Sequence, residues 1–131
     1  MIDYEVKIFN RVHAAVSPLC AKNKFVSKQI VSETAFPAAS LIEMDNTTVR
    51  SLQSSTPGEN FALITYQLDV YATTKSECRK VFAAADEAML GMNFTRISGF
   101  YIDNPGNPDV FRYTARYEAE IDPDGNLYRG S

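Results

Sequence analysis

The sequence predicts an α+β fold, a single mostly antiparallel or mixed sheet of about five strands with two helices packed on one face. Residues 61–72 and 110–121 alternate between apolar and polar side chains, as half-buried strands do. Residues 3–16 and 75–91 instead repeat their apolar side chains at helical spacing. The chain has 131 residues, 45% of them hydrophobic, which is enough for one domain (1–131) with one core.

The first half of the chain predicts one helix followed by two strands. The helix at 3–16 carries His13 on or beside its apolar stripe, so we expect a partly buried histidine. Residues 25–32 alternate loosely, and residues 39–45 alternate with an imperfect period; both predict strands. Residues 46–60 have no clear period and contain Pro and Gly, which predicts a long loop.

The second half begins with the strongest signal in the sequence. The strand at 61–72 runs directly into a helix whose first turn is closed by a capping box of Thr74 and Glu77. Gly91 stands where a left-handed C-cap is expected. The helix buries a stripe of apolar side chains: Cys78, Val81, Phe82, Ala85, Met89 and Met92.

Two more strands and a tail complete the order α-β-β-β-α-β-β. Residues 94–102 predict a strand with Gly99 as a bulge or bend, and residues 110–121 show the cleanest alternation in the chain. Residues 122–131 form a turn and a polar tail. We expect this tail to be loose rather than docked through Leu127 and Tyr128. The short joins between strands favour antiparallel pairing.

Composition excludes several classes of partner. The net charge of −3 argues against general nucleic-acid affinity and against an anionic membrane surface. No apolar run approaches the ~20 residues of a membrane span, and the N-terminal residues lack a secretory signal. Cys20 and Cys78 each fall in an apolar pattern, so we expect buried free thiols.

The sequence contains no recognisable catalytic, metal-binding or cofactor-binding motif. One histidine and two isolated cysteines do not make a zinc site, and no nucleotide-binding or nucleophile motif is present. We therefore expect no enzyme, no metal and no cofactor.

Four charged residues on the last strand are candidates for an interface. Arg112, Arg116, Glu118 and Glu120 occupy alternate positions and should share one face. A solvated ladder of charges is the first interpretation, and a subunit contact built from the same ladder is the second. Acid–base catalysis is the third, because no apolar pocket is evident around the carboxylates.

The loop at 46–60 supplies the other candidates. It is either a disordered insertion or an arm that is ordered against a neighbouring subunit or partner. In the second case Val49 and Leu52 would anchor it, and Arg50 and Gln53 would make polar contacts.

Short sequence segments distributed over nearly the whole chain carry a further signal. They are Met1–Val12, Phe36–Asn46, Tyr66–Tyr71 with Lys75–Cys78, Leu90–Arg96 and Phe111–Ala119. In their order and their amino-acid sequence, these segments resemble the small tail-terminator or tail-completion proteins of long-tailed bacteriophages and prophages.

The resemblance implies a structural virion protein without catalytic residues. Such proteins form a ring of copies, commonly a hexamer, at the head-proximal end of the tail tube. The implied partners are other copies, the tail tube protein and a neck or connector protein, with DNA passing through the ring without specific binding. The implied location is the virion tail or neck, after assembly in the host cytoplasm.

Three alternatives remain open. The first is a head-completion or neck connector protein, a stopper or adaptor of the same virion. The second is a small-ligand or peptide binding module that uses the open sheet face. The third is an enzyme with an unfamiliar site around Arg116, Glu118 and Glu120.

Overall fold

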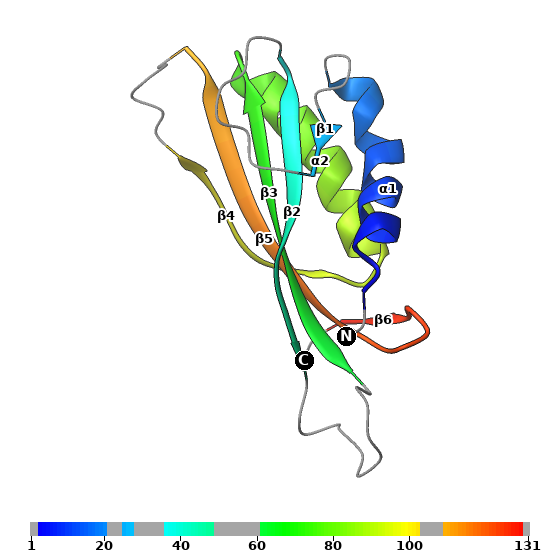
Figure 1. Cartoon of the computed structure of the whole chain (residues 1–131). Helices are drawn as coiled ribbons and strands as arrows, with labels where there is room; N and C mark the ends of the chain where they lie inside the picture. Colours follow the sequence, from blue (N-terminus) through cyan, green and yellow to red (C-terminus); the bar gives the residue numbers. More distant parts are fainter. Residues whose placement is uncertain (1–2, 21–24, 28–35, 49–60, 103–108, 130–131) are drawn as a thin grey trace.

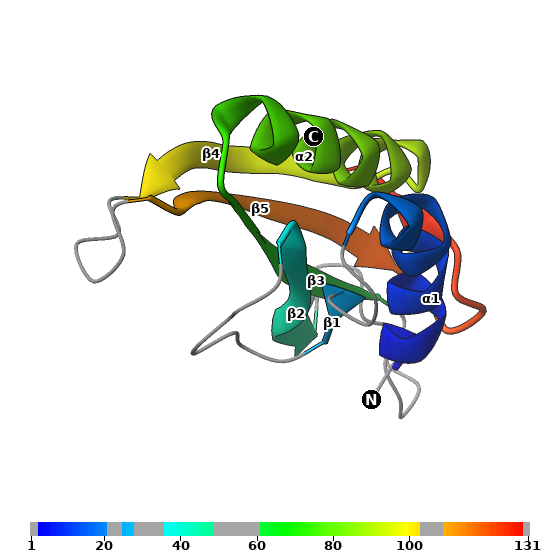
Figure 2. The same cartoon turned by 90° about the horizontal axis from the view of Figure 1, so that it is seen from above.

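The chain folds as one curved sheet with two helices on one side (Figures 1 and 2). The structure, a computed structural model, describes residues 3–20, 25–27, 36–48, 61–102 and 109–129. Its elements are α1 (Glu5–Val16), a 3₁₀ turn (Ser17–Leu19), β1 (Phe25–Val26), β2 (Ala38–Thr48), β3 (Ala62–Ala72), α2 (Lys75–Gly91), β4 (Thr95–Ile102), β5 (Phe111–Ile121) and β6 (Leu127–Tyr128). The predicted α+β class is confirmed.

The sheet is mixed, with the strand order β1-β2-β3-β5-β4 and with β6 paired to β5. All neighbouring pairs are antiparallel except β1 with β2, which is parallel. The predicted strand at 25–32 contributes only Phe25 and Val26, and residues 28–35 lie outside the described part of the chain. The long pairing of β3 with β5, the two strands with the clearest alternation, forms the centre of the sheet.

Both helices cover the same face of the sheet, and the core lies between them and the strands (Figure 2). The side chains that alternate toward the helices from β3 are buried, as are the inward positions of β5. Phe94, which leads into β4, packs its ring against Tyr66 at 5.6 Å between centroids in an edge-to-face contact. The largest fully buried side chains are Tyr66, Tyr117, Phe94, Leu41, Ile64, Leu68, Met89, Ile121, Val12, Val16, Val70 and Val81.

A β-bulge explains the imperfect period of β2. The register with β3 shifts between Glu43 and Asp45, so Met44 is the extra residue. Glu43 lies opposite Tyr66 on the helix-covered side, whereas Asp45 lies opposite Thr65 on the other side. The strand also continues to Thr48, so the prediction that a loop begins at residue 46 was wrong.

Thr74 caps the start of helix α2, as one half of the predicted capping box, and the end of the helix differs from the prediction. The hydroxyl of Thr74 accepts a hydrogen bond from the backbone N–H of Glu77 at 3.1 Å. Gly91 is the last helical residue, and Met92 follows it as the C-cap with φ −92°. The left-handed conformation belongs to Asn93, with φ 73°, so its predicted placement at Gly91 was wrong.

The bulge in β4 also differs from the prediction. The register with β5 shifts between Arg96 and Ser98, which makes Ile97 the bulged residue. Gly99 is regularly paired with Ala115, and a Cβ atom there would lie 2.5 Å from the hydroxyl oxygen of Tyr113. Glycine at 99 therefore permits the close approach of an aromatic side chain.

The C-terminal segment is docked, which corrects the expectation of a loose tail. Leu127 packs against the core, and β6 pairs with the end of β5. The Nδ2 atom of Asn93 donates to the carbonyl of Leu127 at 3.1 Å, and Arg129 donates to the carbonyl of Leu90 at 2.8 Å. At the other end of the chain, the hydroxyl of Tyr4 donates to the carbonyl of Pro123 at 2.7 Å.

His13 lies on an exposed side of α1 and not in the partly buried position that its place in the sequence suggested. Its ring is 5.8 Å from that of Phe9 and 5.7 Å from that of Phe25. The histidine therefore covers aromatic surface at the edge of the core.

Candidate functional site

The charged residues of β5 project from the sheet face that the helices leave uncovered. The register with β3 places Arg112 opposite Tyr71, Arg116 opposite Gln67 and Glu118 opposite Thr65. Their neighbours Tyr117, Ala119 and Ile121 are buried on the helix side. The four predicted residues thus lie along one face of one strand, as the alternation of the sequence indicates.

Arg112 is engaged within the chain. Its Nε and Nη2 atoms donate to the same carboxylate oxygen of Asp69, at 3.2 and 3.1 Å. The Asp69 side chain is only 5% exposed and the Arg112 side chain 26%. The guanidinium also lies 5.5 Å from the ring centre of Tyr71. Arg112 therefore neutralises a buried carboxylate, which limits its availability to a partner.

Arg116 is linked to the same network through a neutral amide. Its Nε atom donates to Gln67 Oε1 at 3.1 Å, and Gln67 Nε2 donates to Asp69 Oδ2 at 3.0 Å. The arginines of β5 thus pair with side chains of β3, whereas the alternation of the sequence indicated a ladder of charges within β5. Asp69 and Gln67 were not selected as site residues, although their alternation on the strand at 61–72 was the available signal.

A row of small polar side chains crosses this face beside the ion pair. Ser40 on β2, Asp69 on β3 and Thr114 on β5 are aligned by the strand register, and all three are buried. Among the described residues, neither the Ser40 nor the Thr114 hydroxyl has a hydrogen-bond partner. This part of the face is therefore less solvated than a uniformly exposed ladder would be.

Half of the predicted interface cannot be placed. Val49, Arg50, Leu52 and Gln53 lie outside the described residues. Glu118 and Glu120 remain partly exposed at the end of β5, and Arg116 is exposed. Of the four charges predicted on β5, these three, rather than Arg112, are accessible to another protein.

The thiols do not form a reactive site. Cys20 and Cys78 are both free, as expected from the sequence; Cys78 is also buried as expected, whereas Cys20 is only partly buried. Burial raises the pKa of each thiol to about 11, so both stay protonated at neutral pH. Within the described ranges, no group of three or more His, Cys, Asp or Glu residues is placed to hold a metal ion. No helix among them is long and apolar enough to cross a membrane.

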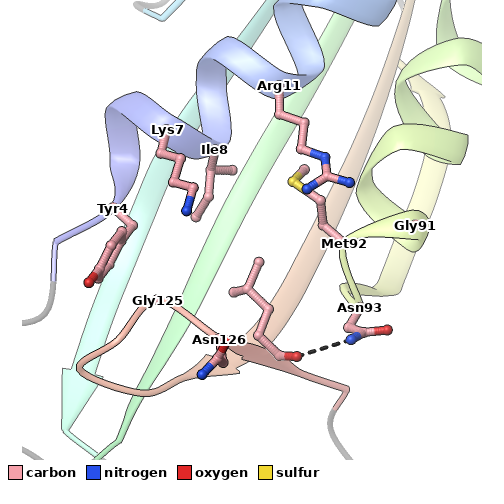
Figure 3. A pocket seen from close by; sticks show the side chains of 10 residues that line it. Tyr4, Lys7, Ile8, Arg11, Gly91, Met92, Asn93, Gly125 and Asn126 are labelled. Atoms are coloured by element: carbon pink, nitrogen blue, oxygen red, sulfur yellow. Dashed lines mark hydrogen bonds between the residues drawn. The ribbon is translucent and has the colours of Figure 1, made fainter.

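A pocket of about 340 Å³ opens where the start of α1 meets the end of α2 and the C-terminal turn (Figure 3). Arg11 extends from α1 toward Met92, whereas Lys7 extends from the same helix on the side of Tyr4, with its Nζ atom 5.9 Å from the centre of the Tyr4 ring. The lining includes two cations and no carboxylate, so the pocket suits a compact anionic group such as an acidic side chain. The lining residues are Tyr4, Lys7, Ile8, Arg11, Gly91, Met92, Asn93, Gly125, Asn126 and Leu127.

Comparisons with known proteins point in one direction. The family described as tail completion protein gp17 matches residues 8–131. The fold is similar to that of a chain in a solved structure entitled "Virion of native gene transfer agent (GTA) particle". The two chains superpose with a TM-score of 0.65 at 14% sequence identity, over 88% of this chain and 91% of the other. No curated protein sequence matches the chain.

Proposed function

Because this chain belongs to the tail completion protein gp17 family, we propose that it forms a ring at the head-proximal end of a phage tail tube, where it ends tube polymerisation and joins the tail to the neck. The family match over residues 8–131 is the observation that carries this proposal. It makes the protein a structural component of a phage-like virion and favours a non-enzymatic role.

The shape of the chain supports self-assembly. Within the part of the chain that the structure describes, the sheet has two open edges, because β4 pairs only with β5 and β1 covers only Ala39 and Ser40 of β2. A body with different surfaces at its two ends can associate head to tail, and such contacts close into a ring when the rotation between copies allows it. We propose a homo-oligomeric ring, with a hexamer as the expected number.

The polar sheet face is the proposed contact with other copies or with the tail tube and neck proteins. Arg116, Glu118 and Glu120 are the accessible charges that β5 contributes to it, because Arg112 is occupied by Asp69. We propose the arm carrying Val49, Arg50, Leu52 and Gln53 as the second part of this contact. Charged groups of this kind set the specificity of an interface more than its strength.

The net charge supports a passage for DNA without binding. A chain with a net charge of −3 that lines a channel would repel phosphate groups and release few counterions. DNA would then slide through the ring without specific contacts. A continuous basic lumen in the assembled ring would contradict this part of the proposal.

Electron microscopy of virions assembled with and without the protein tests the proposed slot. Loss of the protein should give unjoined tails whose tubes have irregular or excessive length, and adding it back should restore joined particles. A neck connector, the alternative from the same virion, would instead leave tubes of normal length. Normal particles without the protein would overturn both.

The predicted arm has its own test in the same assay. Deleting residues 49–55 should leave the thermal unfolding of the isolated protein unchanged and should impair joining of the particles. A triple substitution of Arg116, Glu118 and Glu120 by alanine tests the sheet face separately. Unfolding caused by the deletion would show that the segment belongs to the fold.

A further inference from the structure

Strand β4 is an edge strand that exposes apolar side chains. Within the described residues it pairs on one side only, with β5. Ile97, Phe100 and Tyr101 are 48%, 54% and 38% exposed. Natural proteins commonly protect an exposed edge with lysine or proline, and β4 contains neither. Its one charged residue, Arg96, is paired with Asp86 at 2.9 Å. The strand therefore offers its backbone and its apolar side chains to a further strand.

The opposite edge of the sheet presents a strand of matching length (Figure 2). Strand β1 runs beside only Ala39 and Ser40 of β2, so the segment Leu41–Thr48 extends past it. This segment is as long as β4, which has 8 residues. Strands β2, β3, β5 and β4 alternate in direction, so β2 and β4 run antiparallel to each other. A neighbouring copy in the same orientation would therefore place its β2 beside β4 with the antiparallel alternation unbroken.

Each of these two edge strands has one bulge, and the two bulges produce the same spacing. On β2 the helix-covered side is occupied by Glu43 and next by Asn46, three positions apart instead of two. On β4 the same side is occupied by Arg96 and next by Gly99, again three positions apart. A regular strand laid along either edge would turn its side chains to the wrong face beyond the bulge. The two edges match each other on both sides of the bulge when their bulges lie opposite.

This alignment determines which side chains meet on the uncovered side of the sheet. Phe100 of one copy then lies opposite Ile42 of the next, and Thr95 lies opposite Thr47. Aromatic side chains opposite β-branched ones, and threonine opposite threonine, are among the pairs that stabilise neighbouring strands. The ring of Phe100, which is exposed in the single chain, would gain an apolar neighbour.

The charges of the two strands favour this pairing over a joint between identical edges. The segment Leu41–Thr48 contains Glu43 and Asp45 and no cation, whereas β4 contains Arg96 and no carboxylate. Two β2 edges would bring the carboxylates of both copies into one joint, and like charges on neighbouring strands are destabilising. Two β4 edges would leave β2 open in both copies. Pairing β4 with β2 places opposite charges in one joint, and the Arg96 side chain is still 42% exposed beside Asp86.

We propose that β4 of one copy pairs with the Leu41–Thr48 segment of β2 in the next copy, as the joint between successive copies of the ring. The inference rests on the proposed ring function and adds the strands that join the copies. Two different edges of one sheet form a heterologous contact, which repeats from copy to copy until the ring closes. Backbone hydrogen bonds supply the affinity of such a joint, and the alternate side chains supply its specificity.

Cross-linking in assembled particles tests the joint. Particles that lack the protein are complemented with a chain carrying Phe100→Cys and Ile42→Cys, and are then treated with a short thiol cross-linker. Opposed residues on neighbouring strands have Cβ atoms roughly 5 Å apart, so this variant should give a ladder of covalent multimers. Wild-type particles measure the background from Cys78, which is buried, and Cys20, which is partly buried.

Two other cysteine pairs are the controls. Ile42→Cys with Glu87→Cys joins the same strand to an exposed position on α2, and it should give no multimers above the wild-type background. Thr95→Cys with Phe100→Cys should cross-link copies only if two β4 strands pair with each other. Multimers from this last variant, or none from Phe100→Cys with Ile42→Cys, would overturn the proposal while leaving the virion role untouched. Absence of the wild-type protein from the particles would instead contradict the proposed function, and the joint with it.

A lysine on the edge strand tests the same joint without cysteines. Phe100→Lys should leave thermal unfolding nearly unchanged, because residue 100 is 54% exposed, and should abolish joined particles. Val6→Lys, at a position on α1 that is 72% exposed, is the matched control and should assemble as the wild type does. Adding Ile42→Glu to Phe100→Lys should restore joined particles, since opposite charges then face each other across the joint. Normal assembly of Phe100→Lys, or an equal loss in Val6→Lys, would rule out β4 as the joining edge.

Discussion

Arg112 and Asp69 are diagonal neighbours on adjacent antiparallel strands, and the arginine directs two of its N–H groups to a single carboxylate oxygen. The other oxygen of Asp69 accepts from Gln67. This arrangement fixes β3 against β5 on the side of the sheet that has no helix. The pair therefore contributes mainly to the stability of the sheet and not to an interface.

Substitution of Arg112 should destabilise the fold, because it leaves a buried carboxylate without its counter-charge. Arg112→Ala leaves the Asp69 carboxylate buried without its cation, and we expect the free energy of unfolding to fall by about 3 kcal/mol. Arg116→Ala is the matched control, because that side chain is exposed and bonds only a neutral amide, and it should cost about 0.5 kcal/mol or less. Urea unfolding of both variants measures the difference, and equal losses would contradict this assignment.

The pH dependence of stability should report Glu43. Its pKa is raised in the folded chain from 4.5 to about 7, so the folded state binds the proton more tightly than the unfolded state does. The stabilisation is complete below pH 4.5 and is lost as the pH rises through about 7. Thermal unfolding of Glu43→Gln should therefore lack this decline, and Glu5→Ala should move it to lower pH. An unchanged profile in Glu43→Gln would assign the decline to another group.

Truncation of Phe94 tests the core. Its ring is fully buried against Tyr66, so Phe94→Ala should cost about 3–5 kcal/mol of unfolding free energy. Phe100 lies on the edge strand β4, which follows Phe94, but it is 54% exposed, and Phe100→Ala should cost about 0.5 kcal/mol or less. Similar losses for the two variants would mean that β4 packs differently from the structure described above.

Gly99 and Tyr113 form a coupled pair. A methyl group at residue 99 would lie 2.5 Å from the Tyr113 hydroxyl, so Gly99→Ala should cost about 1–3 kcal/mol. In a Tyr113→Phe background the closest atom is absent, and the same substitution should cost less. A double-mutant cycle by chemical denaturation measures this coupling, and strictly additive effects would exclude the steric contact.

The main elements could be predicted because their signals are local. The alternation of 61–72 and the Thr74 cap depend on neighbours a few residues away, and both predictions are confirmed. The bulges at Met44 and Ile97 could not be located in this way, because a bulge is defined by the opposite strand. Gly91 was assigned the left-handed position on the propensity of glycine alone, whereas Asn93 adopts it and its side chain bonds the carbonyl of Leu127, a contact that no local pattern reveals.

For the candidate site, the sequence predicts which residues share one face of the sheet but not which residues they pair with. Alternation placed Arg112, Arg116, Glu118 and Glu120 on one face, yet their partners depend on the β3–β5 register. That register brings Asp69 to Arg112 across 43 positions in the sequence, a distance that no local pattern spans.

The hydrogen bond from Tyr4 to Pro123 joins residues that are 119 positions apart. During synthesis, α1 leaves the ribosome long before its final neighbour has been translated. The first helix must therefore wait, incompletely packed, until nearly the whole polypeptide has emerged. In a nascent chain, the apolar face of α1 therefore stays open to other molecules until its C-terminal neighbour has been made.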